Sequence, residues 1–198
     1  MKKLALILAA TTFLSGPVIA QSVGEKTGVN STLGIAPKTQ DFVTEAATSD
    51  MLEISAAKIA QHKGNADEKK FAAQMITEHT KTSADIKQLI DSGALKAELP
   101  TALNSSSQSK LDKLNNAKPD EFAAVYDPMQ VAAHEDAVSL FERYAKGGDN
   151  AKLKDWAGKT LPALRDHLQM VLQLENNRRG ATVGTAPSRE TPAPYGAK

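Results

Sequence analysis

The sequence predicts an all-α protein built around a four-helix bundle. Three observations lead to this prediction: apolar residues recur every three or four positions in four long stretches, aromatic residues make up only 5% of the chain, and glycines or prolines separate the stretches. A chain of 198 residues accommodates one such domain with additional segments at its ends. Cysteine is absent, which excludes disulfides, thiolate metal ligands, a thiol nucleophile and a lipid anchor on cysteine.

Residues 1–20 have the pattern of a cleaved export signal. Lys2 and Lys3 precede a short apolar run, and small residues lead up to an expected cut after Ala20. A membrane-spanning helix needs about 20 apolar residues, so this run is too short for the competing interpretation as an anchor. We therefore expect an exported, periplasmic protein without a transmembrane segment in its mature chain. Residues 21–38 are rich in Gly, Ser and Thr, and we expect them to form a flexible lead.

The first two helices are expected over residues 39–62 and 67–92. In both, the residues on one side follow the alternating steps of three and four that are typical of a bundle seam. The seam of the first helix consists of Phe42, Ala46, Ser49, Glu53, Ala56 and Ala60, and that of the second consists of Phe71, Met75, His79, Thr82, Ile86 and Leu89. Gly64 and Gly93 follow the two helices, at the position where glycine commonly ends a helix.

The last two helices of the expected domain, residues 39–176, follow a long connection between the second and third helices. This connection is long enough to cross the bundle, and its apolar pattern predicts a short extra helix near Leu111. The third helix is expected from about Pro119, and the fourth from about Asn150. One proline lies inside each pattern, so we expect a kink or a delayed start in the third helix and a bend or break in the fourth.

The chain ends in a stretch rich in Pro and Gly, residues 177–198, which we expect to be disordered. This tail is basic, whereas the region between the export signal and the tail is net acidic. An acidic body is a poor electrostatic partner for nucleic acid, so we expect no nucleic-acid binding. The basic tail could instead bind a component of the cell envelope or another protein.

Glu53, His79, His134 and His167 form a candidate metal site. The histidines lie on core-facing stripes of the last three helices, with His134 at the edge of its stripe. Glu53 lies on the seam of the first helix, where a buried carboxylate is costly unless it is paired. Facing helices of a bundle can bring such residues to one level, where they could bind zinc, copper or iron. The alternative is a hydrogen-bonded polar layer without a metal. A ferritin-type di-iron site is disfavoured, because no Glu precedes a His by three residues.

Several short motifs stand in order across residues 41–174. They are Phe42-x-x-Glu45-Ala46-Ala47, Phe71-Ala72-x-x-Met75-Ile76-x-Glu78-His79, Tyr126-x-x-Met129 with His134, and Thr160-Leu161-Pro162-x-Leu164-x-x-His167-Leu168. Together they resemble a bacterial family of exported bundles that is classified as a domain of unknown function and often labelled as outer-membrane or periplasmic. This resemblance implies a ferritin-like four-helix fold and export, and it supplies no catalytic assignment. Glu78 departs from the family pattern, which usually has Asp there.

The sequence offers little support for an enzyme. It contains no G-x-S-x-G motif, and Gly147-Gly148 lacks the pattern of a phosphate-binding loop. We therefore expect a non-enzymatic binding or structural module, linked to envelope stress or surface adaptation. The alternative is a metal-binding or metal-dependent redox protein with the His/Glu site inside the bundle.

Overall fold

The computed structural model describes residues 21–184, with the side chains of Lys26 and of residues 181–184 left out of the description. The expected export signal and residues 185–198 of the expected tail lie outside the described residues. Within the described part the chain is all-helical, with seven helices and no strand, so the predicted all-α class is confirmed. No helix among residues 21–184 combines the length and the apolar character needed to cross a membrane.

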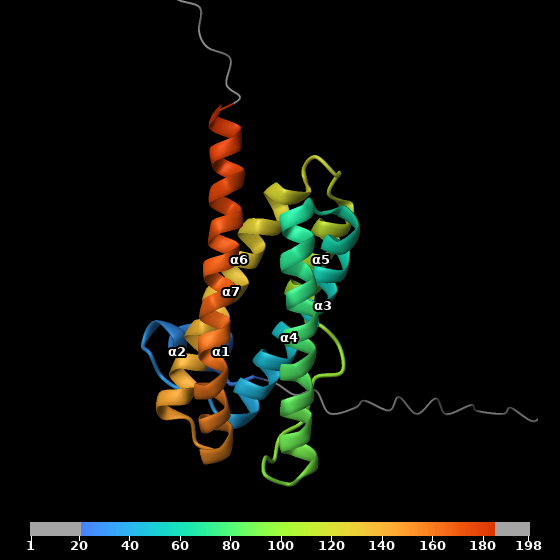
Figure 1. Ribbon diagram of the computed structural model, residues 1–198. Coiled ribbons are helices and arrows are strands. Elements are labelled where there is room, and N and C mark those ends of the chain that lie inside the picture. The colour runs from blue at the N-terminus through green and yellow to red at the C-terminus, as the bar shows by residue number, and fades with distance from the viewer. Residues whose placement is uncertain (1–20, 185–198) are drawn as a thin grey trace, which may run out of the picture.

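Four long helices make up most of the fold: α3 (Thr39–Lys63), α4 (Ala66–Asp91), α6 (Phe122–Gly147) and α7 (Ala151–Gly184). α3 and α4 pack as one antiparallel hairpin, and α6 and α7 pack as another (Figure 1). The connection between the hairpins contains α5 (Ser105–Asn116) and returns along the length of the helices, so α4 and α6 run in the same direction (Figure 1). The short helix expected near Leu111 is therefore present as α5.

Short polar residues fix the starts of the two helices that contribute His79 and His167. The Asn65 side chain accepts a hydrogen bond from the Glu68 N–H at 3.0 Å, and the Glu68 carboxylate accepts one from the Asn65 N–H at 2.8 Å. This reciprocal capping box starts α4. The Asn150 side chain accepts a hydrogen bond from the first turn of α7 in the same way. Both caps therefore fix where these helices begin.

The two helix-interior prolines do not interrupt their helices. Pro128 lies inside α6, which begins at Phe122 rather than later, and Pro162 lies inside α7. A delayed start of the third helix and a break in the fourth are therefore wrong, whereas the alternatives, a kink and a bend, stay predictions. A proline removes one backbone hydrogen bond, and the buried side chains of Leu164 and Val171 hold the part of α7 beyond it against the core. α7 also continues to Gly184, into the stretch expected to be a tail.

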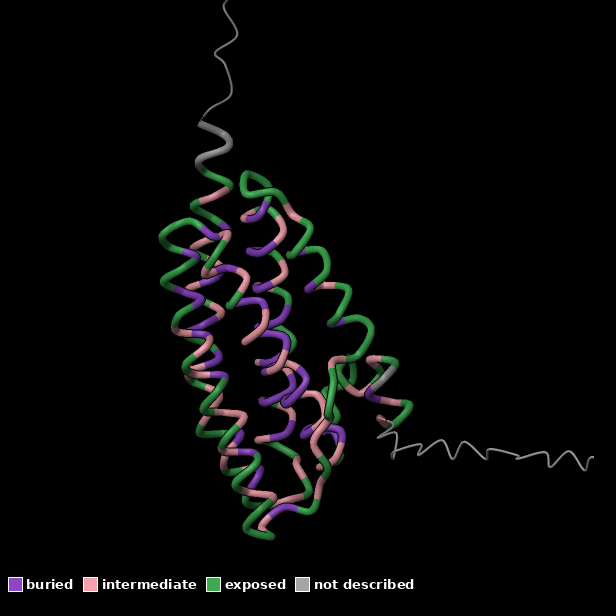
Figure 2. Tube along the Cα trace, turned by 90° about the vertical axis from the view of Figure 1, so that its right-hand side faces the viewer, coloured by how far each residue is buried: buried purple, intermediate pink, exposed green. Residues whose placement is uncertain are grey.

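The core consists of two apolar clusters separated by a polar layer. Buried positions line the inward faces of the long helices (Figure 2). One cluster centres on Phe42, Phe141, Tyr144 and Leu153, and the other on Phe71, Met75, Phe122 and Tyr126. On α4, α6 and α7 the buried histidine lies between the residues of the two clusters. The candidate site residues therefore occupy one level of the fold.

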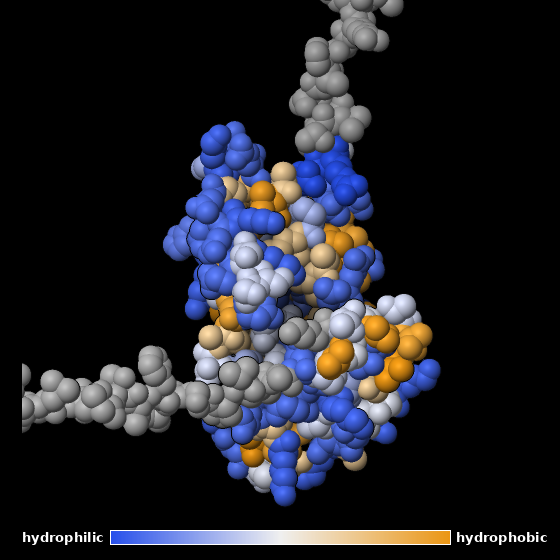
Figure 3. All heavy atoms as spheres, turned by 180° about the vertical axis from the view of Figure 1, so that it is seen from behind, coloured by the Kyte–Doolittle hydropathy of each residue, from blue (hydrophilic) through white to orange (hydrophobic). Residues whose placement is uncertain are grey.

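Two short helices, α1 (Val23–Lys26) and α2 (Val29–Thr32), precede α3 in a segment for which the sequence predicts no helix. A buried ion pair holds them, because the Arg143 guanidinium donates to the Glu25 carboxylate at 2.6 Å and both side chains are largely buried. Apolar side chains remain exposed on this segment and gather in one patch (Figure 3), formed by Val23, Val29, Leu33 and Ile35. The segment thus covers part of α6 while leaving aliphatic surface in water.

Candidate metal centre

Three histidines from three helices meet in the polar layer. His79 on α4, His134 on α6 and His167 on α7 are at most 3% exposed. Their ring centroids lie 5.5 to 5.9 Å apart, and one nitrogen of each ring lies within 4.8 Å of the other two. The structure therefore brings together the three histidines that the sequence predicts as ligands. The fourth histidine, His62, is exposed near the end of α3.

The outward-facing nitrogen of each ring has a protein acceptor. His79 Nδ1 donates to Asp50 Oδ1 at 2.8 Å, and His134 Nδ1 donates to the main-chain carbonyl of Gln130 at 2.9 Å. His167 Nε2 donates to Glu78 Oε2 at 2.6 Å. Because carbonyl and carboxylate oxygens only accept, these contacts place a proton on the outward nitrogen of each ring. The inward nitrogens of the neutral rings are then lone-pair donors.

The inward nitrogens have no hydrogen-bond partner among the described residues. They are Nε2 of His79, Nε2 of His134 and Nδ1 of His167, and all three are buried. A buried polar atom without a partner costs about 1–3 kcal/mol. Three such nitrogens in one polar layer are therefore an unfavourable arrangement, unless a proton or a cation lies close to them.

The surroundings of His134 and His167 favour their neutral form. Burial lowers the pKa of His134 to about 4, and the hydrogen bond to Gln130 offsets this only in part. Burial and the nearby His134 also lower the pKa of His167, against the opposing effect of Glu78. Neutral imidazole is the form that binds metals. Two of the three rings are therefore held in the form that a metal ion requires.

His79 differs from the other two histidines. Burial lowers its pKa, but the hydrogen bond to Asp50 and the negative charge of Glu53 outweigh burial and raise it above the ordinary value. Asp50 is fixed in turn, because its second carboxylate oxygen accepts hydrogen bonds from Thr82 at 2.8 Å and Ser83 at 2.9 Å. This ring therefore holds a proton more firmly, and a bound cation would replace that proton.

Glu53 lies beside the three histidines, outside their closest group. It is 1% exposed, and neither carboxylate oxygen has a hydrogen-bond partner in the described part of the chain. Burial raises its pKa above the ordinary value, and the nearby His79 offsets this only in part. A buried carboxylate of this kind is stable only with a proton or a cation close by. Glu53 stays a predicted fourth site residue, because the group of three histidines does not include it.

The donor set fits a transition-metal ion. Neutral imidazoles with one carboxylate suit zinc, copper or iron, and each imidazole already has the outward hydrogen bond that orients metal-bound histidines. Two nitrogens bound to one tetrahedral zinc ion lie roughly 3.3 Å apart, given Zn–N bonds of about 2.0–2.1 Å. The rings would therefore have to move inward by a modest amount. One cation would satisfy all three inward nitrogens, and a carboxylate lies nearby.

The sequence reasoning did not identify Asp50, Glu78 and Gln130, the residues that orient the three rings. Glu78 does not lie on the inward-facing seam of α4, because it directly precedes His79 and adjacent residues point to different sides of a helix. Its side chain instead reaches His167 on α7. Asp50 lies on α3 three residues before Glu53, on a neighbouring face. One signal could have indicated both: a metal-bound histidine usually needs a carboxylate or carbonyl for its second nitrogen.

Comparison with known families places these residues within one domain. A family model described as "Domain of unknown function (DUF4142)" matches residues 24–174, which includes Glu53 and all three buried histidines. No curated protein and no solved structure matches the chain.

Proposed function

The chain belongs to the DUF4142 family, a domain of unknown function, and we propose that it is a metal-binding protein that holds one transition-metal ion between His79, His134 and His167. One observation carries the proposal. Three buried histidines each offer a nitrogen within 4.8 Å of the other two, and in each ring one nitrogen is hydrogen-bonded while the other has no partner among the described residues. A structural polar layer would instead be expected to pair its donors with its acceptors inside the layer.

Zinc, copper and iron are the candidate ions, because the site offers nitrogen and carboxylate oxygen donors and the chain has no thiolate. When bound, such an ion supplies Lewis acidity, and copper or iron also supplies redox chemistry. Glu53 serves as the fourth donor in this proposal. A cavity of about 470 Å³ is lined by none of the site residues, although Leu52 and Ala133 are sequence neighbours of Glu53 and His134. This separation favours a metal-holding role over the turnover of a substrate.

We also propose that the fold is a ferritin-like four-helix bundle. Its support is the arrangement of two antiparallel hairpins joined by a long connection, with α4 and α6 running in the same direction (Figure 1). The Glu-x-x-His pairs of di-iron ferritin-like proteins are absent from the sequence. A single ion bound mainly by histidines therefore fits this chain better than a di-iron centre.

The place of action is proposed to be the bacterial periplasm, where the protein would hold its metal as an envelope component. The support is the export pattern of residues 1–20, which lie outside the described residues. A periplasmic protein with a histidine site would encounter metals that enter the envelope. Fractionation of cells that produce the untagged chain checks this part of the proposal, which fails if the protein stays with the cytoplasmic fraction.

Metal titration of the purified, untagged protein after removal of metal by a chelator tests the proposed function. At a free metal concentration one hundred times the Kd, binding to the folded state adds about 2.7 kcal/mol of stability. We expect zinc, copper or iron to raise the Tm of the wild-type protein by several degrees. His134→Ala should abolish this rise, whereas His62→Ala, which removes an exposed histidine, should preserve it.

Two outcomes would contradict the proposal. If none of the three metals changes the Tm of the wild-type protein, the histidines and Glu53 form a structural polar layer. If His62→Ala abolishes the rise as fully as His134→Ala does, the metal binds at the surface. In either case the remaining candidate is a non-enzymatic bundle that acts through its surface.

A further inference from the structure

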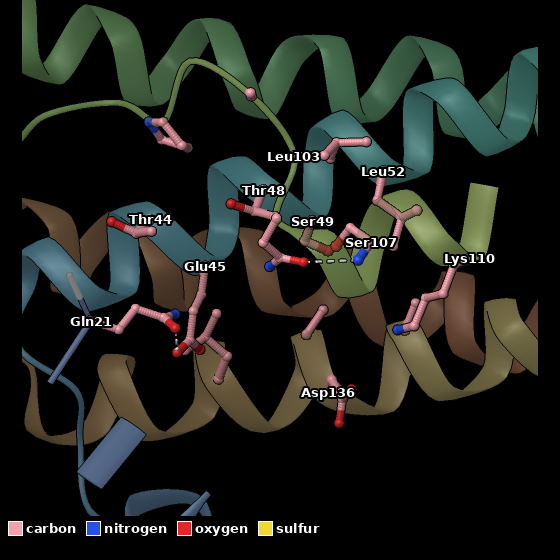
Figure 4. A pocket seen from close by; sticks show the side chains of 16 residues that line it. Gln21, Thr44, Glu45, Thr48, Ser49, Leu52, Leu103, Ser107, Lys110 and Asp136 are labelled. Carbon is pink, nitrogen blue, oxygen red and sulfur yellow. Dashed lines mark hydrogen bonds between the residues drawn. The ribbon is translucent and has the colours of Figure 1, made fainter. Parts of the chain in front are cut away.

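A cavity of about 470 Å³ lies between α3, α5 and α6 (Figure 4). Its volume is within the range of small-molecule sites, roughly 300–1,000 Å³. Leu52 of α3 and Ala133 of α6 line it, and each is the sequence neighbour of a metal-site residue. The cavity is therefore next to the metal centre but is formed by different side chains.

The cavity has an apolar wall, polar side chains of Thr48, Ser49 and Ser107 near its middle, and a charged group near each end. Its apolar wall is formed by Leu52, Pro100, Leu103, Ala137 and Leu140. Glu45 of α3 lies near one end and Lys110 of α5 near the other, with Asp136 of α6 on the opposite wall (Figure 4). A molecule that fits this cavity would place an apolar body along the wall and a polar group near Glu45.

The end that contains Glu45 has an excess of negative charge. The charged groups that act on Glu45 are the carboxylates of Glu25, Asp41 and Asp136 and a single cation, Arg143. Arg143 is already engaged, because it donates to both oxygens of Glu25, at 2.6 and 3.3 Å. Glu45 itself receives one hydrogen bond from the uncharged amide of Gln21, at 2.9 Å.

Within residues 21–184, Glu45 therefore has no cationic side chain of its own. Burial and the nearby Glu25 raise the pKa of its half-buried carboxyl to about 7. A cation held against this carboxylate would relieve the repulsion between the four acidic groups. Lys110 at the far end would disfavour a second positive charge on the same ligand.

We propose that this cavity binds a small organic cation, a primary amine with an apolar body. Its ammonium group lies against Glu45, and its body lies along Leu52 and Leu140. The proposal is independent of the metal site, because none of these residues holds or orients a site histidine.

Isothermal titration of the purified full chain with hexylammonium, hexanol and hexanoate tests the proposal. The three probes share one apolar body and differ in charge. We expect hexylammonium to bind at least tenfold more tightly than the other two. Glu45→Gln should remove this preference, whereas Glu135→Gln, which removes the same charge from an exposed position on α6, should change the Kd by less than twofold.

A second variant locates the binding. Ala102 is exposed at the cavity wall, so Ala102→Trp narrows the cavity without disturbing the core, and it should weaken hexylammonium binding at least tenfold. The proposal is overturned if hexylammonium does not bind at millimolar concentration, or if hexanol and hexanoate bind equally well. It is also overturned if Glu45→Gln retains the preference for the amine, or if Ala102→Trp binds hexylammonium as the wild type does.

Discussion

Replacement of Glu53 by glutamine should change the stability of the metal-free protein and that of the metal-bound protein in opposite directions. Glu53 is 1% exposed, and its two carboxylate oxygens have no hydrogen-bond partner within residues 21–184. The amide of Gln130 is also buried and without a partner in the described chain. A glutamine at position 53 could pair with Gln130 through one donor and one acceptor, and it would remove a buried charge.

The magnitude follows from the burial of the carboxylate. An unsatisfied buried polar group costs about 1–3 kcal/mol, so Glu53→Gln should raise the free energy of unfolding of the chelated protein by about that amount. For a chain of this length, the change corresponds to about 2–4 °C in Tm per kcal/mol. In the presence of saturating metal, Glu53→Gln should instead lower the free energy of unfolding relative to the wild type. A neutral amide then replaces a charged metal ligand, so the metal stabilises the variant less than the wild type.

Urea unfolding of both proteins, with chelator and with metal, measures the two effects. Glu135→Gln serves as the control, because it removes one exposed carboxylate from α6 and should shift either state by less than about 0.5 kcal/mol. A loss of stability on Glu53→Gln in the chelated protein would refute the reasoning, since it would mean that Glu53 is already paired in the metal-free core.

Three further predictions concern other parts of the fold. Burial and the nearby Glu68 raise the pKa of Asp127 from 3.8 to about 6, so its contribution to stability is full below about pH 4 and is lost as the pH rises through 6. The difference in free energy of unfolding between Asp127→Asn and the wild type, measured with urea, should therefore shift in favour of the variant by up to about 3 kcal/mol from pH 4 to pH 7. A difference that stays the same at both pH values would contradict this prediction. Asp50→Asn should weaken metal binding by about 10–100-fold in a competition titration, because it replaces the acceptor that orients a ligand histidine; an unchanged Kd would count against the site. Arg143→Ala leaves Glu25 without its buried partner, so trypsin or Glu-C should cleave residues 21–37 faster while the Tm of the rest changes little, and equal cleavage rates would contradict the docking of this segment.

The helix pattern allowed the candidate ligands to be predicted from the sequence. His79, His134 and His167 each fall on the inward stripe of a long helix, and the 3.6-residue period is sufficient to turn them toward the core. The start of α7 at about Asn150 was also expected from the sequence, whereas the Asn65 cap that starts α4 was not.

The contacts that the sequence did not reveal join residues far apart in the chain. The ion pair that holds α1 joins Glu25 to Arg143, which are 118 residues apart, so composition alone gave no sign of it. Similarly, Arg178 in the extended part of α7 donates to Asp127 of α6 at 3.2 Å, and this contact supports helix beyond the expected end. Such contacts depend on the rotation and overlap of packed helices, which local periodicity does not determine.

Elemental analysis of the untagged protein, purified from the periplasm without added metal or chelator, tests the central claim most directly. The account predicts close to one zinc, copper or iron ion per chain in the wild type and in His62→Ala, and a loss of that ion in His134→Ala. A wild-type protein that folds normally and contains no stoichiometric metal, and that takes up none of the three ions in titration, would contradict the assignment of the buried histidines as a metal centre.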